Sequence, residues 1–158
     1  MSVTLCPFDS ADSDRVARFR VHPDQIRFSG TPAEALKHAE TNPEIDAHLI
    51  LDAGTPVGLF KIDRAYADVH PFAASRGLGL RAFMIDIDSQ GRGLAQAAVR
   101  AMPSYLRLHY PWTPAVFLTV NMANTAAIRA YLRGGFQDTG KIWPHGDAGP
   151  QHIMRMAF

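Results

Sequence analysis

The chain has 158 residues, of which 47% are hydrophobic and 20% are charged, and its formal net charge at pH 7 is +1. These values are typical of one globular domain. They exclude a strongly basic surface for nucleic acid or anionic lipid, and no apolar run is long enough to span a membrane. We therefore expect a single domain over residues 1–158, with neither nucleic acid nor a membrane as its partner.

The only cysteine is Cys6, so no internal disulfide can form. The first ten residues, MSVTLCPFDS, do not place an apolar core behind a basic segment, and we expect no secretory signal. Both features favour a reducing, cytoplasmic location. Cys6 precedes Pro7 in an apolar segment, which indicates a small packing residue rather than a nucleophile.

The first third of the chain predicts one strand followed by helical stretches. Residues 3–8 predict the strand, and Asp9 or Ser10 can cap a short helix that runs toward Phe19. The segment HPDQIRFSGTPAEALKHAETNPE predicts a second helical stretch, with Pro32 in its first turn and apolar residues on one face.

The middle of the chain has β character. AHLILD, AGTP and VGLFKID predict two strands joined by a tight turn at Gly54, which is a β-hairpin. The next stretch, RAYADVHPFAASRGLG, is loop-like, and its Gly77 and Gly79 are typical of a turn into a following strand. That strand, LRAFMIDI, is predicted to end at Ile87.

The last third alternates helices and strands. Apolar residues recur at helical spacing from Leu94 to Leu108, although Pro103 should kink or split this helix. A strand (AVFLTV), a helix (NTAAIRAYLRG) and two closing strands (FQDTGKIW and HIMRMAF) follow. This order predicts a mixed α/β (α+β) sheet with helices packed on it.

The stretch QGRGLAQAA, residues 90–98, joins the predicted strand LRAFMIDI to the helix after it. A helix that begins near Arg92 leaves the backbone amides of residues 91–95 without intrahelical partners. Gly91 and Gly93 let the backbone curl and let a ligand approach, and aligned amides at a helix start suit a phosphate or pyrophosphate. The alternative is a glycine-softened turn that binds nothing.

Two common phosphate motifs do not fit this stretch. A Walker loop requires Gly-Lys-Ser/Thr, which is absent. A dinucleotide fingerprint from Gly91 requires Gly or Ala where the chain has Gln96, and an acidic residue about twenty positions later, where the chain reads YPWTPAV. A phosphate-loop protein that uses ATP is therefore only a weak alternative.

A second stretch, LTVNMANTAAIRAYLRGGF, places Asn124 before a helix and Tyr131 two turns later on the same face. Gly134 and Gly135 end this helix. Taken alone, Asn124 is explained as a helix cap and Tyr131 as a half-buried packing residue.

Together the two stretches resemble a known family. Gln90, Gly93 and Ala95 after a strand, then Asn124, Tyr131 and a Gly-Phe pair, closely resemble the motifs of the GNAT superfamily of acyl-CoA-dependent N-acyltransferases. The resemblance covers residue 80 to the carboxyl terminus. It is closest to bacterial small-amine (polyamine-type) acetyltransferases, in which segments such as PDQIRFSG, PVGLF and NTAAIRAYLRGGFQDTG recur.

The resemblance implies a GNAT-like fold, with a mixed, mostly antiparallel sheet of six to seven strands, a splayed central pair and about four helices on both faces. It also implies that acetyl-CoA lies with its pyrophosphate on the amides after Gln90 and its pantetheine arm along the strand FMIDI. Gln90 and Arg92 would add side-chain contacts to the pyrophosphate. The residues so assigned to the cofactor are Ile85, Ile87, Gln90, Gly91, Arg92, Gly93, Leu94, Ala95, Asn124, Ala127 and Tyr131.

Direct transfer from a thioester to an amine requires a neutral amine, a polarised carbonyl and a proton for the leaving thiolate. By the resemblance, Tyr131 stands near the thioester sulfur, and a phenol can protonate a thiolate, so we expect Tyr131 to be the general acid. A strand amide near Ile85 is expected to stabilise the tetrahedral oxygen.

The general base is where the chain departs from the family pattern. Several polyamine-acetylating relatives carry a glutamate four residues before the Ile85 position, where this chain has Arg81, so polyamine specificity is in doubt. Asp86 points either into the gap or to solvent. Three more polar residues are expected to border the acceptor side: Asp63, Asp68 and His70. They either help to remove the proton of the amine or are ordinary loop residues.

The sequence therefore predicts an acetyl-CoA-dependent N-acetyltransferase acting on a primary amine of a small molecule or amino-acid derivative, because no acidic run suggests docking of a basic protein tail. The enzymatic alternative is acetylation of a protein amino terminus or lysine. The alternative from another class is a catalytically silent module that binds acyl-CoA, which Arg81 in place of a carboxylate supports. We expect no metal, since His145 and His152 are too sparse for a site, and a homodimer is left open.

Overall fold

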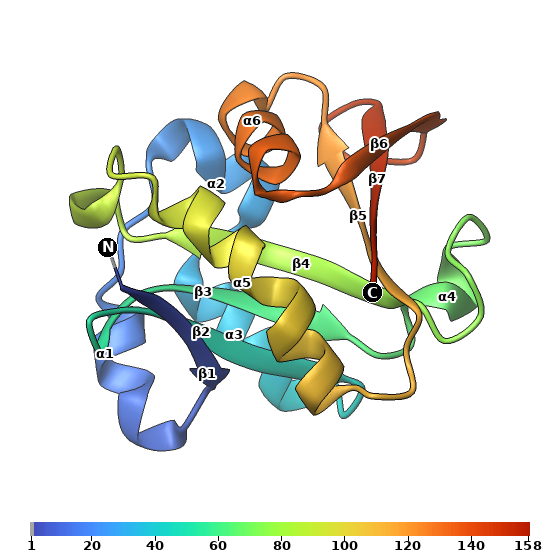
Figure 1. The fold of residues 1–158 in the computed structure, drawn as a ribbon. Coiled ribbons are helices and arrows are strands. Elements are labelled where there is room, and N and C mark those ends of the chain that lie inside the picture. The colour runs from blue at the N-terminus through green and yellow to red at the C-terminus, as the bar shows by residue number, and fades with distance from the viewer. Residues whose placement is uncertain (1) are drawn as a thin grey trace.

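The structure is a computed structural model and describes residues 2–158. These residues form a seven-stranded sheet in the order β1-β2-β3-β4-β5-β7-β6 (Figure 1). The strands are β1 (Val3–Pro7), β2 (Ile45–Asp52), β3 (Thr55–Asp63), β4 (Leu78–Ile85), β5 (Ala115–Asn121), β6 (Gln137–Trp143) and β7 (Gln151–Ala157). Neighbouring strands are antiparallel except for β4 and β5, which are parallel. The mixed, mostly antiparallel sheet and the predicted hairpin (β2–β3) are confirmed.

Six α-helices and two short 3-10 helices connect the strands of the described chain. They are η1 (Ser10–Asp12), α1 (Ser13–Ala17), α2 (Pro23–Ser29), α3 (Pro32–Thr41), α4 (Tyr66–Val69), η2 (Ile87–Ser89), α5 (Leu94–His109) and α6 (Thr125–Gly134). The number exceeds the expected four partly because Gly30, with φ of +74°, divides the second predicted stretch into α2 and α3. Pro103 does not split α5. None of the helices in residues 2–158 has the length and apolarity needed to cross a membrane.

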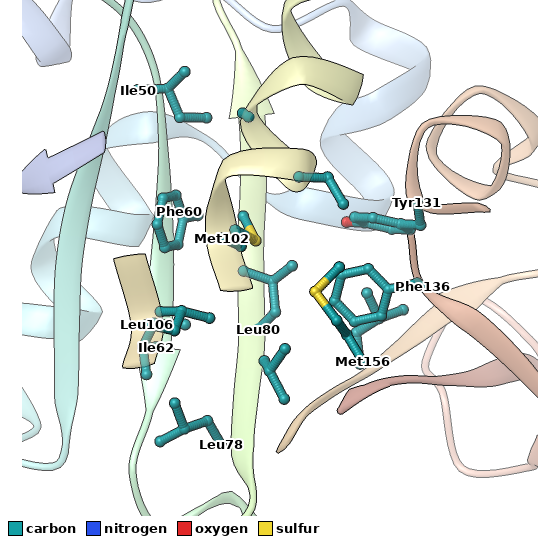
Figure 2. Packing of buried hydrophobic residues seen from close by; sticks show 14 of the residues in the cluster. Ile50, Phe60, Ile62, Leu78, Leu80, Met102, Leu106, Tyr131, Phe136 and Met156 are labelled. Carbon is teal, nitrogen blue, oxygen red and sulfur yellow. The ribbon is translucent and has the colours of Figure 1, made fainter. Parts of the chain in front are cut away.

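Different helices cover the two faces of the sheet (Figure 1). On one face, Met102 and Leu106 of α5 pack against Phe60 and Leu80 of the central strands, as Figure 2 shows. On the other face, α1 and α3 pack around a separate cluster that includes Leu59. Burial of each such side chain contributes about 1.5–3 kcal/mol, so the central strands are held firmly from both sides.

The sheet opens between β4 and β5. These two strands pair only at their beginnings, where Leu78 faces Val116 and Gly79 faces Phe117. The remainder of β4, up to Ile85, has no strand partner on this side. The predicted splayed pair of central strands is therefore present, and it leaves a backbone edge of β4 free in the middle of the molecule.

Two boundaries of β4 differ from the prediction. The strand stops at Ile85, and Ile87 begins η2, because the Ile87 amide donates to the carbonyl of Arg20 at 2.8 Å instead of continuing the strand. Gly79 lies inside β4 rather than in the turn before it. A Cβ on Gly79 would lie 1.9 Å from the ring of Tyr66, so only glycine fits there.

Candidate active site

The turn between η2 and α5 carries a row of unpaired backbone amides. Helix α5 begins at Leu94, two residues after the expected start, with Gly93 as its N-cap. Gly91 and Gly93 have φ of +80° and +75°, in the region that favours glycine. Within the described chain, the amides of residues 91–95 donate to no protein acceptor. They lie at the positive end of the α5 dipole and are available to an anion.

A cavity of about 210 Å³ opens at this turn and extends between the end of β4 and α6. Most of its lining is apolar, and half of the lining residues are glycine, alanine or serine, which suits a narrow chain-like ligand. Nine of the eleven residues assigned to the cofactor line it: Ile85, Gln90, Gly91, Gly93, Leu94, Ala95, Asn124, Ala127 and Tyr131. The two stretches singled out in the sequence are thus brought together around one space.

The free edge of β4 faces this cavity. The Asp86 amide donates to the carbonyl of Val57 on β3 at 2.8 Å. Because backbone groups alternate in direction along a strand, the N–H and C=O of Ile85 point the other way, into the gap between β4 and β5. The Ile85 carbonyl accepts a hydrogen bond from Nε2 of Gln90 at 2.9 Å, so Gln90 ties the end of β4 to the turn.

Helix α6 places Tyr131 at the inner end of the cavity. The Asn124 side chain caps this helix by accepting from the Ala127 amide at 3.4 Å. Tyr131 is 8% exposed, and its ring contacts Phe83 and Phe136 at centroid distances of 5.8 and 5.6 Å. Figure 2 shows its hydroxyl extending from α6 toward β4. Burial raises the pKa of Tyr131 well above its usual value, so the phenol keeps its proton at neutral pH.

A second cavity, of about 390 Å³, adjoins the first and shares Phe83, Asn124 and Tyr131 with it. Its walls come from α2, α4, β4, β5 and the connection between β6 and β7. In contrast to the first cavity, it is lined by large polar and aromatic side chains, which include Tyr66, His70, Arg81, Trp143, His145 and Asp147. The two cavities therefore meet at Tyr131.

Comparisons with known proteins identify the family of the chain. A family model described as an acetyltransferase (GNAT) domain matches residues 11–143. The chain belongs to this family. It is also 30% identical over 136 residues to an uncharacterized N-acetyltransferase, YbbJ, of Bacillus subtilis strain 168, with 82% of each chain covered. The protein is therefore a GNAT acetyltransferase, as the sequence predicts.

Solved structures show the same GNAT fold. An aminoglycoside acetyltransferase, AAC(6')-Ib, in complex with coenzyme A and kanamycin superimposes with a TM-score of 0.80 at 18% identity, over 99% of this chain and 95% of that one. A spermidine N-acetyltransferase of Vibrio cholerae, in complex with CoA and spermine, gives a TM-score of 0.70 at 16% identity, over 98% and 95% of the two chains. These neighbours bind CoA together with small amines.

Two of the predicted cofactor residues lie outside the first cavity of this GNAT domain. Ile87 is beyond the end of β4, and its amide is already used by Arg20. The guanidinium of Arg92 turns away to the β2–β3 hairpin, where it pairs with Asp52 at 2.6 Å. The prediction that the strand continues to Ile87 is therefore wrong, whereas its contact with the pantetheine arm stays a prediction. A side-chain contact from Arg92 to a pyrophosphate would require this ion pair to break.

The acidic residues named from the sequence have structural roles. Asp86 accepts from the Arg20 amide at 2.9 Å, which anchors the segment before α2. Asp63 is 5% exposed, and its two oxygens accept from Nε of Arg81 at 3.0 Å and from the Ala65 amide at 2.9 Å. Asp68 lies in the first turn of α4 and lines neither cavity. None of these carboxylates faces the expected position of the amine.

His70 lines the second cavity, as the prediction allowed. Its ring stacks on Tyr66 at 3.8 Å, and its Nδ1 lies 3.0 Å from the Tyr66 carbonyl, which can only accept, so Nδ1 carries the proton and Nε2 is left basic. Burial lowers the pKa of His70, which keeps the imidazole neutral. In residues 2–158 no three His, Cys, Asp or Glu side chains gather in a way that could hold a metal ion.

Sequence reasoning missed the contribution of α2. Gln25 and Ser29 line the first cavity, and Arg27 and Phe28 line the second, so this short helix borders both. The Oε1 of Gln25 also accepts from Nε2 of Gln90 at 3.4 Å. The sequence predicts a helical stretch over PDQIRFSG, but nothing in its spacing shows that this helix borders the two cavities.

Proposed function

We propose that the protein transfers an acetyl group from acetyl-CoA directly to a primary amine of a small molecule. The observation that carries this proposal is the meeting of the two cavities at Tyr131, one with the unpaired amides at its mouth and the other with polar side chains. Such a junction lets a tethered thioester and an amine approach from opposite directions. Two bound reactants in fixed positions gain the large rate advantage of proximity.

The first cavity is proposed to hold the cofactor. The pyrophosphate binds the amides of residues 91–95, and each charge-assisted hydrogen bond contributes about 1.5–3 kcal/mol. The pantetheine arm lies along the free edge of β4 at Ile85, in the manner of an added strand. Asn124 and Ala127 contact it from α6. Gln90 acts by holding the end of β4 in place.

The chemical step follows from these positions. The amine nitrogen attacks the thioester carbon, the C–N bond forms, and the tetrahedral oxygen is stabilised by the Ile85 amide on the free edge of β4. The C–S bond then breaks, and Tyr131 donates its proton to the departing sulfur. The nitrogen gives up the extra proton that it carries after attack to water on the acceptor side, and Tyr131 regains a proton from solvent, so that the amide and the free thiol are the products. The phenol holds a proton at neutral pH, although its raised pKa makes it a weaker acid than an exposed tyrosine. General acid catalysis of this kind is typically worth about 10²–10⁴ in rate.

The amine must lose a proton before it attacks. An alkylamine with a pKa near 10.4 costs roughly 4–5 kcal/mol to neutralise at pH 7. Three groups that line the second cavity can accept this proton, directly or through water: His70, His145 and Asp147. Within residues 2–158, the lining of the first cavity includes no carboxylate, so the proton is proposed to leave on the acceptor side.

The test is release of free thiol from acetyl-CoA against a panel of primary amines, together with calorimetric binding of CoA and ADP. We expect turnover with at least one small amine and tighter binding of CoA than of ADP. Tight CoA binding without turnover would support the silent module, and turnover only with peptide amino termini or lysines would support a protein acceptor. The cytoplasmic location stays a prediction from the sequence. The oligomeric state also stays open, and light scattering would measure it.

A further inference from the structure

The second cavity has the wrong charge for a polycationic acceptor. Two arginines line it, Arg27 and Arg81, whereas Asp147 is its one lining carboxylate among residues 2–158. Asp147 and Arg27 are both exposed to solvent, so their charges are screened, and the half-buried Arg81 dominates the field inside the cavity. A polyamine or an aminoglycoside carries several ammonium groups and would meet like charge here.

Arg81 is held with part of its guanidinium free. Its Nε donates to Asp63 at 3.0 Å, while the structure shows no protein acceptor for either Nη group. The side chain is 35% exposed, and it lies over the ring of Tyr66 with the guanidinium carbon 5.1 Å from the ring centroid. Two supports, one ionic and one aromatic, therefore fix the group at the cavity wall while its Nη donors stay available.

Asp63 supports Arg81 and does not compete with it for a ligand. Both Asp63 oxygens are occupied, one by Nε of Arg81 and the other by the Ala65 amide. Lys61 stands directly across the ladder from Arg81 but lines neither cavity, since its Nζ contacts Nδ1 of His38 at 2.6 Å and burial lowers its pKa to about 8. The wall of the cavity therefore attracts an anion through the Nη donors of Arg81 itself.

From this arrangement we infer that the acceptor is a primary amine that also bears a carboxylate, such as an amino acid or a short peptide, and that the Nη groups of Arg81 bind this carboxylate. The inference rests on the proposed function, since it names the substrate class of the same site. A guanidinium can bind a carboxylate through two parallel hydrogen bonds, which fixes the direction in which the amine points.

The spacing along β4 suits such a substrate. Arg81 lies two residues before Phe83, whose ring contacts Tyr131. Two residues of a regular strand span roughly 7 Å, and the bulge at Ala82, which has φ of +52°, makes this value an upper limit here. A carboxylate on Arg81 and an amine near Tyr131 are therefore separated by about the length of an amino acid or a dipeptide. The aromatic walls contributed by Phe28 and Trp143 leave apolar surface for a side chain between the two ends.

Matched sets of acceptors test this inference. Each set contains a free amino acid, its primary amide and the amine left when the carboxylate is removed, and the panel adds dipeptides, spermidine and kanamycin. We expect kcat/KM to be about 10- to 100-fold higher for the acid than for its two partners, as one charge-assisted interaction gives. A higher kcat/KM for spermidine or kanamycin than for every acid would overturn the inference.

Variants of Arg81 locate the effect. Arg81→Gln should lower the ratio of kcat/KM for the acid to kcat/KM for the amide to about 1, mainly by raising the KM of the acid. Arg81→Lys should retain part of this preference. Because Arg81→Gln leaves Asp63 buried without its cation, the double variant Asp63→Asn/Arg81→Gln is made in parallel to keep the pair neutral. Persistence of the full preference in folded Arg81→Gln or in the double variant contradicts the assignment.

Arg64 supplies the matched control. Its Nε donates to Asp46 at 3.1 Å and its side chain is 40% exposed, so it forms an arginine–aspartate pair with a similar Nε–carboxylate distance, but it lines neither cavity. Arg64→Gln should keep the preference for the acid. Loss of the preference in both variants would mean that any disturbed pair produces the effect, and the inference would fail.

A binding experiment distinguishes failure of this inference from failure of the proposed function. Affinities of the acid, the amide and the decarboxylated amine are measured calorimetrically on protein saturated with CoA, which cannot react. Turnover without a preference for acids overturns the inference and leaves the proposed function intact. Selective binding of acids that Arg81→Gln abolishes, without turnover of any amine, supports the inference while the proposed transfer fails.

Discussion

The two cavities that meet at Tyr131 are built from different parts of the polypeptide. The cofactor cavity presents backbone groups to its ligand, namely the amides of residues 91–95 and the edge of β4, beside the small side chains of α6. The acceptor cavity is made of side chains, among them Arg81, His70 and Trp143. A backbone site can serve one invariant ligand in many relatives, whereas a side-chain site changes with each substitution.

This difference predicts how the two cavities respond to mutation. Changes that alter the backbone path at the turn should affect CoA for every acceptor alike. Changes in the acceptor cavity should affect the choice of amine and leave CoA affinity intact. Tyr131, which borders both, should affect the chemical step itself.

The largest effect is expected from Tyr131→Phe. Removal of the hydroxyl deletes the proposed proton donor and keeps the ring against Phe83, so kcat should fall by about 10²–10⁴-fold with little change in the Kd of CoA. Steady-state kinetics and calorimetry measure the two quantities. Tyr105→Phe is the control, because the Tyr105 hydroxyl bonds to His48 outside both cavities. A Tyr131→Phe variant with undiminished kcat would remove Tyr131 from the mechanism.

The next effect is expected from Gly93→Val. At φ of +75° a β-branched residue costs about 1–2 kcal/mol, and relief of that strain turns amides of the turn away from the pyrophosphate. The Kd of CoA should rise by about 100-fold. Gly140, at φ of +78° in the edge strand β6, gives a control with similar strain and open space around its Cβ. The backbone origin of the site is disproved if both variants bind CoA equally well.

The sequence was sufficient for the fold and for the position of the glycine turn. The turn was predictable because its glycines, its amides and the start of α5 lie within a few residues of each other, so local rules apply. The hairpin and the Asn124 cap were predictable for the same reason. The resemblance then placed Tyr131 beside the turn, which no spacing alone could do.

The acceptor cavity could not be predicted in this way. Its walls come from α2, α4, β4 and the β6–β7 connection, which meet only because the sheet opens between β4 and β5. The pairing of Arg81 with Asp63 and of Arg92 with Asp52 also joins positions far apart in the chain. The end of β4 was misplaced since the apolar Ile87 continues the strand pattern while its amide is taken by Arg20.

A third prediction concerns a histidine outside both cavities. His48 is 3% exposed, and its Nδ1 and Nε2 bond to the hydroxyls of Tyr105 and Tyr110 at 2.6 and 2.8 Å. The Tyr110 hydroxyl donates to Asp46, so it accepts from Nε2, and the neutral imidazole is satisfied. Burial lowers the pKa of His48 to about 4.

Between pH 6.5 and pH 4, His48 is protonated in the unfolded chain but stays neutral in the folded chain. The contribution of His48 to the free energy of unfolding is therefore fully present above pH 6.5 and is lost as the pH falls toward 4. The loss attributable to His48 should be on the order of 3 kcal/mol in the free energy of unfolding. Urea denaturation of the protein and of His48→Gln at pH 7 and pH 4 measures it, and the variant should lose less stability over this interval. Equal losses would show that His48 does not titrate in this way. The catalytic pH profile should be the same for both proteins.

The smallest effect, and the one that separates side-chain from backbone recognition most sharply, is expected from Arg92→Gln. The Arg92–Asp52 pair is partly exposed, with side-chain exposures of 54% and 15%, so its loss should cost less than about 1 kcal/mol of stability. If the turn binds CoA through its amides alone, the Kd should change by less than about threefold, as it should in the control Arg20→Gln, which removes the neighbouring pair with Asp88. A tenfold rise confined to Arg92→Gln would mean that the guanidinium leaves Asp52 for the pyrophosphate when CoA binds, and the cofactor cavity would then depend on a side chain after all.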